Sequence, residues 1–412
     1  MKKVAFISHG HPELSKGGAE VASWNLYTLL KHKGFDCLYI ARTDAKSHGG
    51  STFSSRGNEV LLHTAMTEWF TLSSSHLKPL FVDLAELLRE YSPDVVHIHH
   101  YAHMGIELFA AIRQALPDTK IVFTLHEFMA MCMHNGQMVK RETLKLCYKA
   151  TANDCHQCFP SNSPGDFLLR KQYLLDQFSH VDEFISPSHF LAKRYVDWGL
   201  DVEKMHVIEN VLPPRSAIEP RQISENGKRG KFAFFGQINP YKGLDILLHA
   251  ITLLPPDIRA QIHLDVHGAN LDKQPAEFRE RVESLLAQTK DCVDIRGPYE
   301  AEQLPSRIAE CDWVVIPSIW WENSPVVIQE AMQFGRPLIG SNIGGMKEKI
   351  ENKAGLTFEA RSAASLAAAL VKATDPDVFE HWQEKLAINH NAENEHIALL
   401  ESLFSDISAT GS

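Results

Sequence analysis

Residues suited to binding a charged ligand are concentrated between residues 313 and 345. The apolar run Trp313–Pro317 predicts a buried strand, and a short loop that ends in Glu322–Pro325 follows it. Ser324 is a favourable N-cap and Pro325 a favourable first helical residue, so we expect a helix to begin there. A helix that follows a parallel strand directs unpaired N–H groups and the positive end of its dipole towards the sheet edge. Such an edge binds anions, phosphate among them.

Two glutamates flank this helix start and suit the hydroxyl groups of sugars. Glu322 stands just before the predicted helix and Glu330 about two turns inside it. A carboxylate is a strong acceptor for paired hydroxyls, so Glu330 could hold a ribose and Glu322 a sugar next to the phosphate. The alternative is a solvated helix with two unrelated glutamates. The cap and the Gly-x-Pro and Gly-Gly pairs that follow weigh against it.

A second candidate for anion binding is the loop Phe234–Gly243, which follows the first strand of the second half. Lys242 stands near the predicted start of a helix, where a lysine adds a point charge for a leaving diphosphate. Gly236 and Gln237 belong to the same loop. A plain surface lysine at a turn is the alternative interpretation.

The first half carries a glycine pair and several histidines. Gly17 and Gly18 join the first strand to the first helix and let backbone approach a ligand closely, although a plain turn explains them equally well. His97 and His99 alternate onto one face of a strand, where hydrogen-bonded histidines are a more economical interpretation than a metal site. His126 follows a strand at its carboxyl end, where ligand sites of α/β folds form.

Residues 128–166 lose periodicity and contain four cysteines. These are Cys132, Cys147, Cys155 and Cys158, the last two as C-x2-C. Four thiolates could close a structural tetrahedral zinc site, with His134 and His156 as competing ligands. Buried, reduced thiols are the other interpretation, and the sequence leaves both open.

Strand-like and helix-like stretches alternate along the chain and predict an α/β fold with parallel sheets. A stretch rich in proline and glycine over 211–230 divides two such series and is expected to be a linker. The stretch 375–408 is expected to be helical. The predicted strands are Lys3–Ser8, Asp36–Ala41, Val95–His99, Lys120–Leu125, Glu183–Ser186 and His206–Ile208, then Lys231–Phe235, Ile262–His267, Cys292–Arg296, Trp313–Pro317 and Pro337–Gly340.

The length, the charge and the apolar runs of the chain limit the functions that it can have. A chain of 412 residues predicts two domains of roughly 200 residues each. The formal net charge of −10 disfavours a nucleic-acid partner. The short apolar N-terminus lacks a cleavage site for a signal peptide, and no apolar run reaches the ~20 residues that span a bilayer. We therefore expect a cytoplasmic protein, with peripheral contact at the inner face of the membrane left open.

The pattern Glu322-x7-Glu330, followed by Gly335-x-Pro337 and Gly344-Gly345, resembles the signature of retaining glycosyltransferases of family 4. The resemblance implies that Glu322 approaches the donor sugar, that Glu330 binds the ribose and that neighbouring amides hold the diphosphate. The Lys242 loop is similar to the family's Gly-Arg-x4-Lys-Gly, with Gln237 where the family has arginine, so one cationic contact is missing. His126 resembles the family histidine beside the transferred sugar.

This resemblance implies the two-domain GT-B fold, in which two Rossmann-like domains with parallel sheets face a central cleft. We expect an acceptor-binding domain over 1–212 with the insertion 128–166, a nucleotide-sugar-binding domain over 213–385, and a helix over 386–412 that crosses back. The expected catalytic residues are His126, Glu322 and Lys242. The expected donor-binding residues are Gly17, Gly18, Gly236, Gln237, Lys242, Asn323, Ser324, Pro325 and Glu330.

The implied reaction moves a hexose-type sugar, with retained configuration, from a nucleotide diphosphate sugar such as a UDP or GDP derivative to a saccharide or lipid-linked acceptor. Assembly of cell-surface polysaccharide or lipopolysaccharide is the implied setting. No metal and no cofactor other than the nucleotide-sugar co-substrate are expected, because the helix dipole and Lys242 take over charge neutralisation. Two alternatives stay open: a nucleotide-sugar 2-epimerase on the same fold, and a non-catalytic sugar-nucleotide-binding protein.

Overall fold

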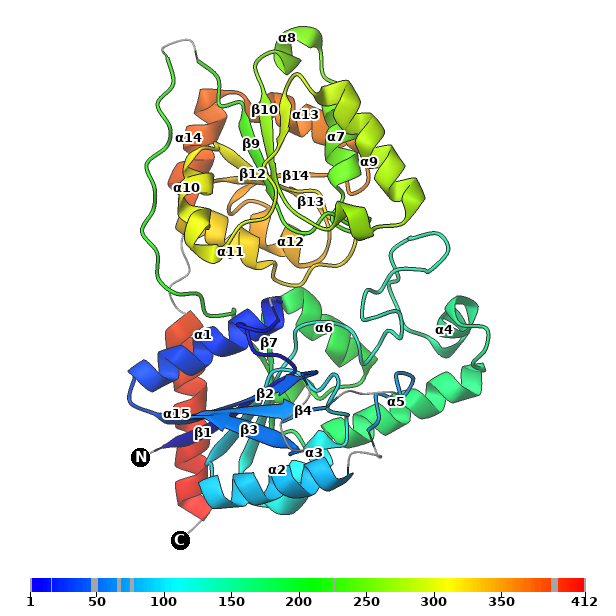
Figure 1. The fold of residues 1–412 in the computed structure, drawn as a ribbon, viewed down its shortest axis with the longest axis vertical. Coiled ribbons are helices and arrows are strands. Elements are labelled where there is room, and N and C mark those ends of the chain that lie inside the picture. The colour runs from blue at the N-terminus through cyan, green and yellow to red at the C-terminus, as the bar shows by residue number, and fades with distance from the viewer. Residues whose placement is uncertain are drawn as a thin grey trace. The chain divides into compact units, whose positions relative to one another are not determined.

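The computed structural model describes residues 2–15, 17–45, 51–64, 68–74, 78–224, 227–386 and 392–410, with backbone alone at 78, 392 and 404–410. The chain divides into two compact units. One comprises Met1–Pro213 and His390–Ser412, and the other Pro214–Asn389. Each unit is a sheet covered by helices on its faces (Figure 1). The division lies next to the expected boundary after residue 212.

The first unit contains eight strands in the order β3-β4-β2-β1-β5-β6-β7-β8, parallel except for the antiparallel pair β3 and β4. They are β1 (Lys3–Ser8), β2 (Asp36–Thr43), β3 (Phe53–Arg56), β4 (Glu59–His63), β5 (Val95–Ile98), β6 (Lys120–Thr124), β7 (Glu183–Ser186) and β8 (Met205–Val207). The helices are α1 (Gly18–His32), α2 (Lys78–Tyr91), α3 (Leu108–Ala115), α4 (Ala152–Cys158), α5 (Pro164–Phe178), α6 (His189–Trp198) and α15 (Ala392–Thr410).

The second unit contains six parallel strands in the order β11-β10-β9-β12-β13-β14. They are β9 (Lys231–Phe235), β10 (His263–His267), β11 (Val293–Ile295), β12 (Trp313–Ile316), β13 (Leu338–Ser341) and β14 (Gly355–Phe358). The helices are α7 (Leu244–Thr252), α8 (Pro256–Arg259), α9 (Ala276–Thr289), α10 (Leu304–Ala309), α11 (Val326–Gln333), α12 (Gly344–Ile350), α13 (Ala363–Ala373) and α14 (Pro376–Lys385).

Both sheets reverse their strand order beside the first strand of the unit. In the first unit the chain adds β2 on one side of β1 and β5 on the other, and in the second it adds β10 and β12 around β9. At such a switch point the loops leaving the carboxyl ends diverge and leave room for a ligand. The loops after β1 and β5, and those after β9 and β12, are therefore the places to look for function.

Continuous apolar runs explain why these strands are central. Val4–Ile7 in β1 and Val314 in β12 are fully buried, as expected for strands covered on both faces. An apolar stripe on α7 is also buried. Its residues are Leu244, Leu247, Leu248 and Ile251. The hairpin β3–β4 was not predicted, because β3 is short, polar and largely exposed and so lacks an apolar pattern.

The final helix belongs to the first unit. Leu400 and Leu403 of α15 pack into the core formed around β1 and β2, and α15 lies beside α1. His396 of the same helix comes within 3.1 Å of the Glu209 carbonyl oxygen through Nε2. The helical stretch expected over 375–408 is thus interrupted after α14, and residues 387–391 lie outside the described part of the chain.

The expected linker contains neither helix nor strand in its described residues, with 225–226 outside them. Arg336 holds it in place. Its fully buried guanidinium donates to the Ile218 carbonyl at 2.7 Å and the Glu219 carbonyl at 3.0 Å. The side chain between Gly335 and Pro337 is therefore structural. No described helix is long and apolar enough to cross a membrane.

Candidate active site

The two residues expected to handle the donor from different loops form a close ion pair. Lys242, after β9, places Nζ 2.6 Å from Oε1 of Glu322, after β12. These loops leave neighbouring parallel strands at the switch point of the second sheet. The structure therefore brings together the lysine loop and the first glutamate, which lie 80 residues apart in the chain.

The lysine loop is shaped by one asparagine and one glycine. Asn239 accepts hydrogen bonds through Oδ1 from the backbone N–H groups of Tyr241 and Lys242, at 3.0 and 3.1 Å. Gly243 has φ of +71°, and a Cβ there would lie 2.0 Å from the Pro317 carbonyl oxygen. Only glycine allows the loop to approach the end of β12 this closely. That approach sets Lys242 against Glu322.

Glu322 is buried and held by several donors. Its Oε1 accepts hydrogen bonds from Ser318 Oγ at 2.9 Å and from Trp320 Nε1 at 2.8 Å, besides the ion pair with Lys242. Burial by itself would raise the pKa of Glu322, but the charge of Lys242 and these hydrogen bonds lower it below the usual range. Glu322 is therefore ionised at neutral pH.

The glycine pair at the start of α12 closes the site from another side. The Gly345 N–H donates to the Glu322 carbonyl oxygen at 2.8 Å. A Cβ on Gly345 would lie 1.7 Å from the Asn323 carbonyl oxygen, so this position requires glycine for close packing. The pair predicted from the Gly-Gly motif thus fixes the backbone that carries Glu322 and Asn323.

Glu330 lies on α11, one turn inside the helix, and is half-buried. Burial raises its pKa, and the nearby charge of Arg215 partly offsets this effect. Tyr299 lies close enough for the Glu330 charge to raise its own pKa after the larger effect of burial. Arg215 and Tyr299 were not predicted as site residues, because one stands in the linker and the other in a loop without a motif.

Gly236 offers open space at the same sheet edge. Its φ is +148°, and a Cβ there would meet no atom within 4 Å. Gln237 beside it is exposed. A cavity of about 410 Å³ begins next to this loop and is lined by Ile238, by Gly268–Asp272 after β10, and by α9. The expected donor-binding residues border this edge but do not line that cavity.

In the first unit, Gly17 lies against a buried carboxylate, and Gly18 is the first residue of α1. Gly17 is the N-cap of α1, and a Cβ there would lie 2.3 Å from Oε2 of Glu20. Glu20 is buried, accepts a hydrogen bond from Ser15 Oγ at 3.0 Å and lies 3.5 Å from His9 Nε2. A side chain at position 17 would therefore have to displace the Glu20 carboxylate, a constraint that the sequence pattern did not reveal.

His126 belongs to a chain of imidazoles at the carboxyl ends of β5 and β6. Its Nε2 lies 3.1 Å from Nδ1 of His99, and His97 contacts Thr124 Oγ1 through Nε2 at 2.8 Å. Burial and the charge of His9 lower the pKa of His126 to about 3. The histidine at this strand end is therefore neutral at physiological pH and can donate or accept one proton in a hydrogen bond.

Glu127, beside His126, is the strongest candidate that the sequence did not single out. Burial raises its pKa to about 8. The hydrogen bond from the Met129 N–H and the charge of Arg170 lower the pKa but only partly offset the effect of burial. Its Oε1 lies 3.5 Å from His100 Nε2. A carboxyl group that keeps its proton near neutral pH at the carboxyl end of the sheet has the properties of a functional group. No spacing motif marks it.

Comparison with known proteins identifies the family. Residues 216–394 match the sequence profile of glycosyl transferases group 1, and residues 16–215 match that of glycosyltransferase family 4. The D-inositol 3-phosphate glycosyltransferase of Arthrobacter sp. (strain FB24) is 30% identical over 393 residues, which cover 89% of this chain and 85% of that protein. This chain is a group 1 glycosyltransferase.

Solved structures agree with this family in fold. Anabaena Alr3699/HepE in complex with UDP and glucose has a TM-score of 0.64 at 16% identity, covering 98% of this chain and 100% of that one. Sucrose-phosphate synthase from Thermosynechococcus elongatus has a TM-score of 0.69 at 16% identity, with the same coverage. The glycosyltransferase therefore has the GT-B class of fold, with two parallel-sheet α/β domains.

One local expectation for this glycosyltransferase is wrong. The helix α11 begins at Val326, and Pro325 rather than Ser324 is its N-cap. Proline has no side-chain oxygen and cannot cap, so no side-chain hydrogen bond closes this helix end. The favourable capping residue stands one position too early, because proline takes an extended conformation (ψ of 124°) before the helix begins.

Proposed function

We propose that this glycosyltransferase moves a hexose-type sugar, with retention of configuration, from a nucleotide diphosphate sugar to a saccharide or lipid-linked acceptor. The observation that carries the proposal is the ion pair between Lys242 and Glu322, 2.6 Å apart at the switch point of the second sheet. A buried carboxylate beside a lysine can bind sugar hydroxyls and the adjacent phosphate together.

In this proposal Glu330 binds the ribose of the donor. Its pKa is raised by burial, so hydrogen bonds donated by two ribose hydroxyls would stabilise its ionised form. Arg215 reduces the cost of that charge. Gly236 and Gln237 would lie along the nucleotide, and open space beside Gly236 supports close approach of the ligand.

The diphosphate would bind between Lys242 and the main chain at the start of α11, around Asn323, Ser324 and Pro325. The amides and the dipole of a helix start stabilise negative charge as it develops on a leaving phosphate. Lys242 has to turn from Glu322 towards the phosphate, which leaves Glu322 free to accept a hydroxyl of the transferred sugar. We propose that no metal ion is needed for this charge neutralisation.

Same-face attack by the acceptor hydroxyl is the proposed route to retention, with the departing diphosphate taking up the proton. We assign His126 to the transferred sugar, and Gly17 and Gly18 to the donor phosphate, on their similarity to the family pattern. With its pKa lowered to about 3, a neutral His126 would act as a hydrogen-bonding partner rather than as a cation.

The names of relatives support the substrate classes. HepE was solved with UDP-glucose, and a relative from Klebsiella pneumoniae, 24% identical over 320 residues and covering 76% of each chain, is named an uncharacterized protein in the cps region. We therefore propose UDP or GDP sugars as donors, and assembly of cell-surface polysaccharide or lipopolysaccharide on the cytoplasmic side of the membrane, with peripheral contact, as the setting.

A thermal-shift screen of nucleoside diphosphates and their sugars tests the donor class, because a bound ligand raises the melting temperature by mass action. The donor found is then incubated with lipid-linked and free saccharides, and the product's anomeric configuration is read by NMR. Transfer with retention, unchanged by added Mg²⁺, is the expected result. Conversion of the donor without any acceptor would replace the proposal with an epimerase.

A further inference from the structure

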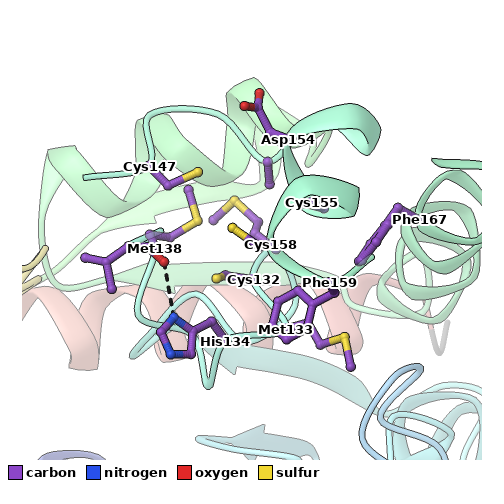
Figure 2. Close-up of a pocket in the computed structure, with 13 residues that line it drawn as sticks. Cys132, Met133, His134, Met138, Cys147, Asp154, Cys155, Cys158, Phe159 and Phe167 are labelled. Atoms are coloured by element: carbon purple, nitrogen blue, oxygen red, sulfur yellow. Dashed lines mark hydrogen bonds between the residues drawn. The ribbon is translucent and has the colours of Figure 1, made fainter. Parts of the chain in front are cut away.

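The four cysteines of the irregular segment 128–163 line one cavity. Figure 2 shows Cys132, Cys147, Cys155 and Cys158 around it, together with Met138. The cavity has a volume of about 20 Å³, which is room for one water-sized species. None of the four is in a disulfide. The fold therefore brings thiols from three separate backbone segments to one small cavity.

The backbone explains how the cysteines converge. The Cys147 N–H donates to the Met138 carbonyl at 2.8 Å, and a bridge between Val139 and Leu146 closes a hairpin beneath them. Cys155 and Cys158 stand three apart on α4, which places them on one face of the helix. The hairpin therefore carries one cysteine towards the helix that carries two.

The fourth cysteine stands on a turn of the main chain. The Cys132 N–H donates to the Phe128 carbonyl at 2.7 Å, and the Cys132 carbonyl accepts from the Gly136 N–H at 3.0 Å. These two hydrogen bonds hold Cys132 in place beside the cavity that the other three cysteines line.

A buried cation lies beside the cavity. Arg170 is 4% exposed and donates to the main-chain carbonyls of Phe70, Met129 and Ala130. None of the described carboxylates forms an ion pair with it, and its charge acts on Cys132 and Cys155 as well as on the buried Tyr101 and Glu127. A buried charge is costly unless it is balanced, and thiolates in the cavity would balance it.

The helix α4 has no core of its own. No residue of α4 is buried, and the helix is only seven residues long. A short helix on an irregular loop gains little stability from apolar burial and needs another source of order. A bound metal ion supplies such order in small irregular segments.

We propose that Cys132, Cys147, Cys155 and Cys158 bind one Zn²⁺ as four thiolates and that the ion fixes the segment 128–163. Each thiol would lose its proton to solvent as its sulfur binds zinc, giving a centre with a net charge of −2. No three of these sulfurs lie within 4.8 Å of one another, so side-chain rotation has to draw them to the ~2.3 Å Zn–S distance. The buried charge of Arg170 would offset part of the negative charge.

His134 is the competing ligand. It also lines the cavity, and its Nδ1 lies 3.1 Å from the Val139 carbonyl oxygen. Histidine that donates one ring N–H to a carbonyl can bind a metal through the other nitrogen. The experiment therefore has to distinguish four sulfurs from three sulfurs and one nitrogen.

The test measures zinc in the full-length protein purified under reducing conditions. We expect about one zinc per chain by mass spectrometry of metals, and retention of that zinc in Cys311→Ser, whose thiol is buried elsewhere. Cys132→Ser and Cys155→Ser should each lose most of it. Absence of zinc from the wild-type protein after expression with added Zn²⁺ would overturn the proposal.

Substitution of Zn²⁺ by Co²⁺ then shows which side chains bind the metal. A Co²⁺-loaded protein with four thiolates should give strong thiolate-to-metal charge-transfer bands that His134→Ala leaves unchanged. Loss of those bands in His134→Ala but not in Cys147→Ser would refute the four-sulfur set. Because a variant that fails to fold would also lose metal, circular dichroism is used to check that each variant is folded. In a separate experiment, an organomercurial is added to the folded wild-type protein, and the zinc released is measured as a function of the number of thiols that have reacted. Release only after four thiols have reacted supports the site.

Discussion

Lys242 and Glu322 neutralise one another across 2.6 Å, although the lysine was expected to hold phosphate and the glutamate to hold sugar. The pair is buried on the glutamate side and about one quarter exposed on the lysine side. A phosphate can therefore reach the lysine first and compete with Glu322 for it. Donor binding and the release of Glu322 for sugar recognition would then be one event.

Replacing Lys242 tests this relationship. Lys242→Met should reduce transfer by on the order of 10²- to 10³-fold, the usual cost of one charge-stabilising donor at a reacting centre. It should also destabilise the protein, because Glu322 would keep a buried charge without its partner. Steady-state kinetics and urea unfolding measure the two effects.

A double variant separates these effects. In Lys242→Met with Glu322→Gln, stability should recover while transfer stays low. If the double variant remained as unstable as Lys242→Met, the pairing would not be the cause. Unchanged kcat in Lys242→Met would remove the lysine from the proposed chemistry.

Glu330 is expected to recognise ribose. Its replacement should weaken the binding of only those ligands that contain a ribose. Glu330→Gln should bind a nucleoside diphosphate about tenfold or more weakly, because a neutral amide accepts hydroxyl hydrogen bonds less strongly than a carboxylate. Pyrophosphate affinity should not change. Isothermal titration calorimetry with both ligands, and with a 2′-deoxy nucleotide as a control, distinguishes the outcomes. Equal losses for pyrophosphate would assign Glu330 to the phosphates instead.

The sequence sufficed for most of the parallel strands and for the loops that carry the proposed donor site, because long apolar runs mark buried parallel strands. It also placed Lys242 and Glu322 at strand ends. It could not reveal that they bind each other, since contact depends on the turn at Gly243 and on its approach to Pro317. Their mutual attraction is a property of tertiary packing.

Residues without a spacing pattern escaped prediction altogether. Burial raises the pKa of Glu127, and its position in the sequence next to His126 does not indicate that burial. Arg215 stands in a linker and reaches Glu330 only through the path of that linker. The helix α11 begins at Val326, one residue later than predicted, because the proline before it has an extended backbone conformation. Burial and local backbone geometry decide such features after the fold has formed.

A side chain at position 17 should displace the buried carboxylate of Glu20. In Gly17→Ala the new Cβ would overlap Oε2 of Glu20, which is buried and hydrogen-bonded to Ser15. We expect a loss of about 1–3 kcal/mol in the free energy of unfolding, as for overpacked sites. Gly165→Ala is the control, since its Cβ would meet only Ser163 Oγ at 3.5 Å. Equal stability of the two variants would show that Glu20 moves aside without cost.

Buried histidines of the first unit should make the protein sensitive to mild acid. Burial lowers the pKa of His396 to about 4, and burial together with the His9 charge lowers that of His126 to about 3. The unfolded chain binds these protons below about pH 6.5, so stability is full above that pH and declines as the pH falls towards 4. Urea midpoints between pH 7.5 and 4.5 measure the decline. His126→Asn should flatten it, and an unaltered slope would contradict the assignment.

Glu127 should have the opposite dependence on pH. Its pKa of about 8 in the folded protein lies above the ordinary value of 4.5, so the native state holds a proton that the unfolded chain has lost. Stability from this group is therefore present below pH 4.5, decreases as the pH rises, and is gone above about 8. Glu127→Gln stays neutral and should be more stable than the wild type at pH 9 but similar at pH 4.5. Paired urea titrations at these two pH values measure this difference. A variant less stable than the wild type at pH 9 would mean that Glu127 is ionised there and bound by a cation.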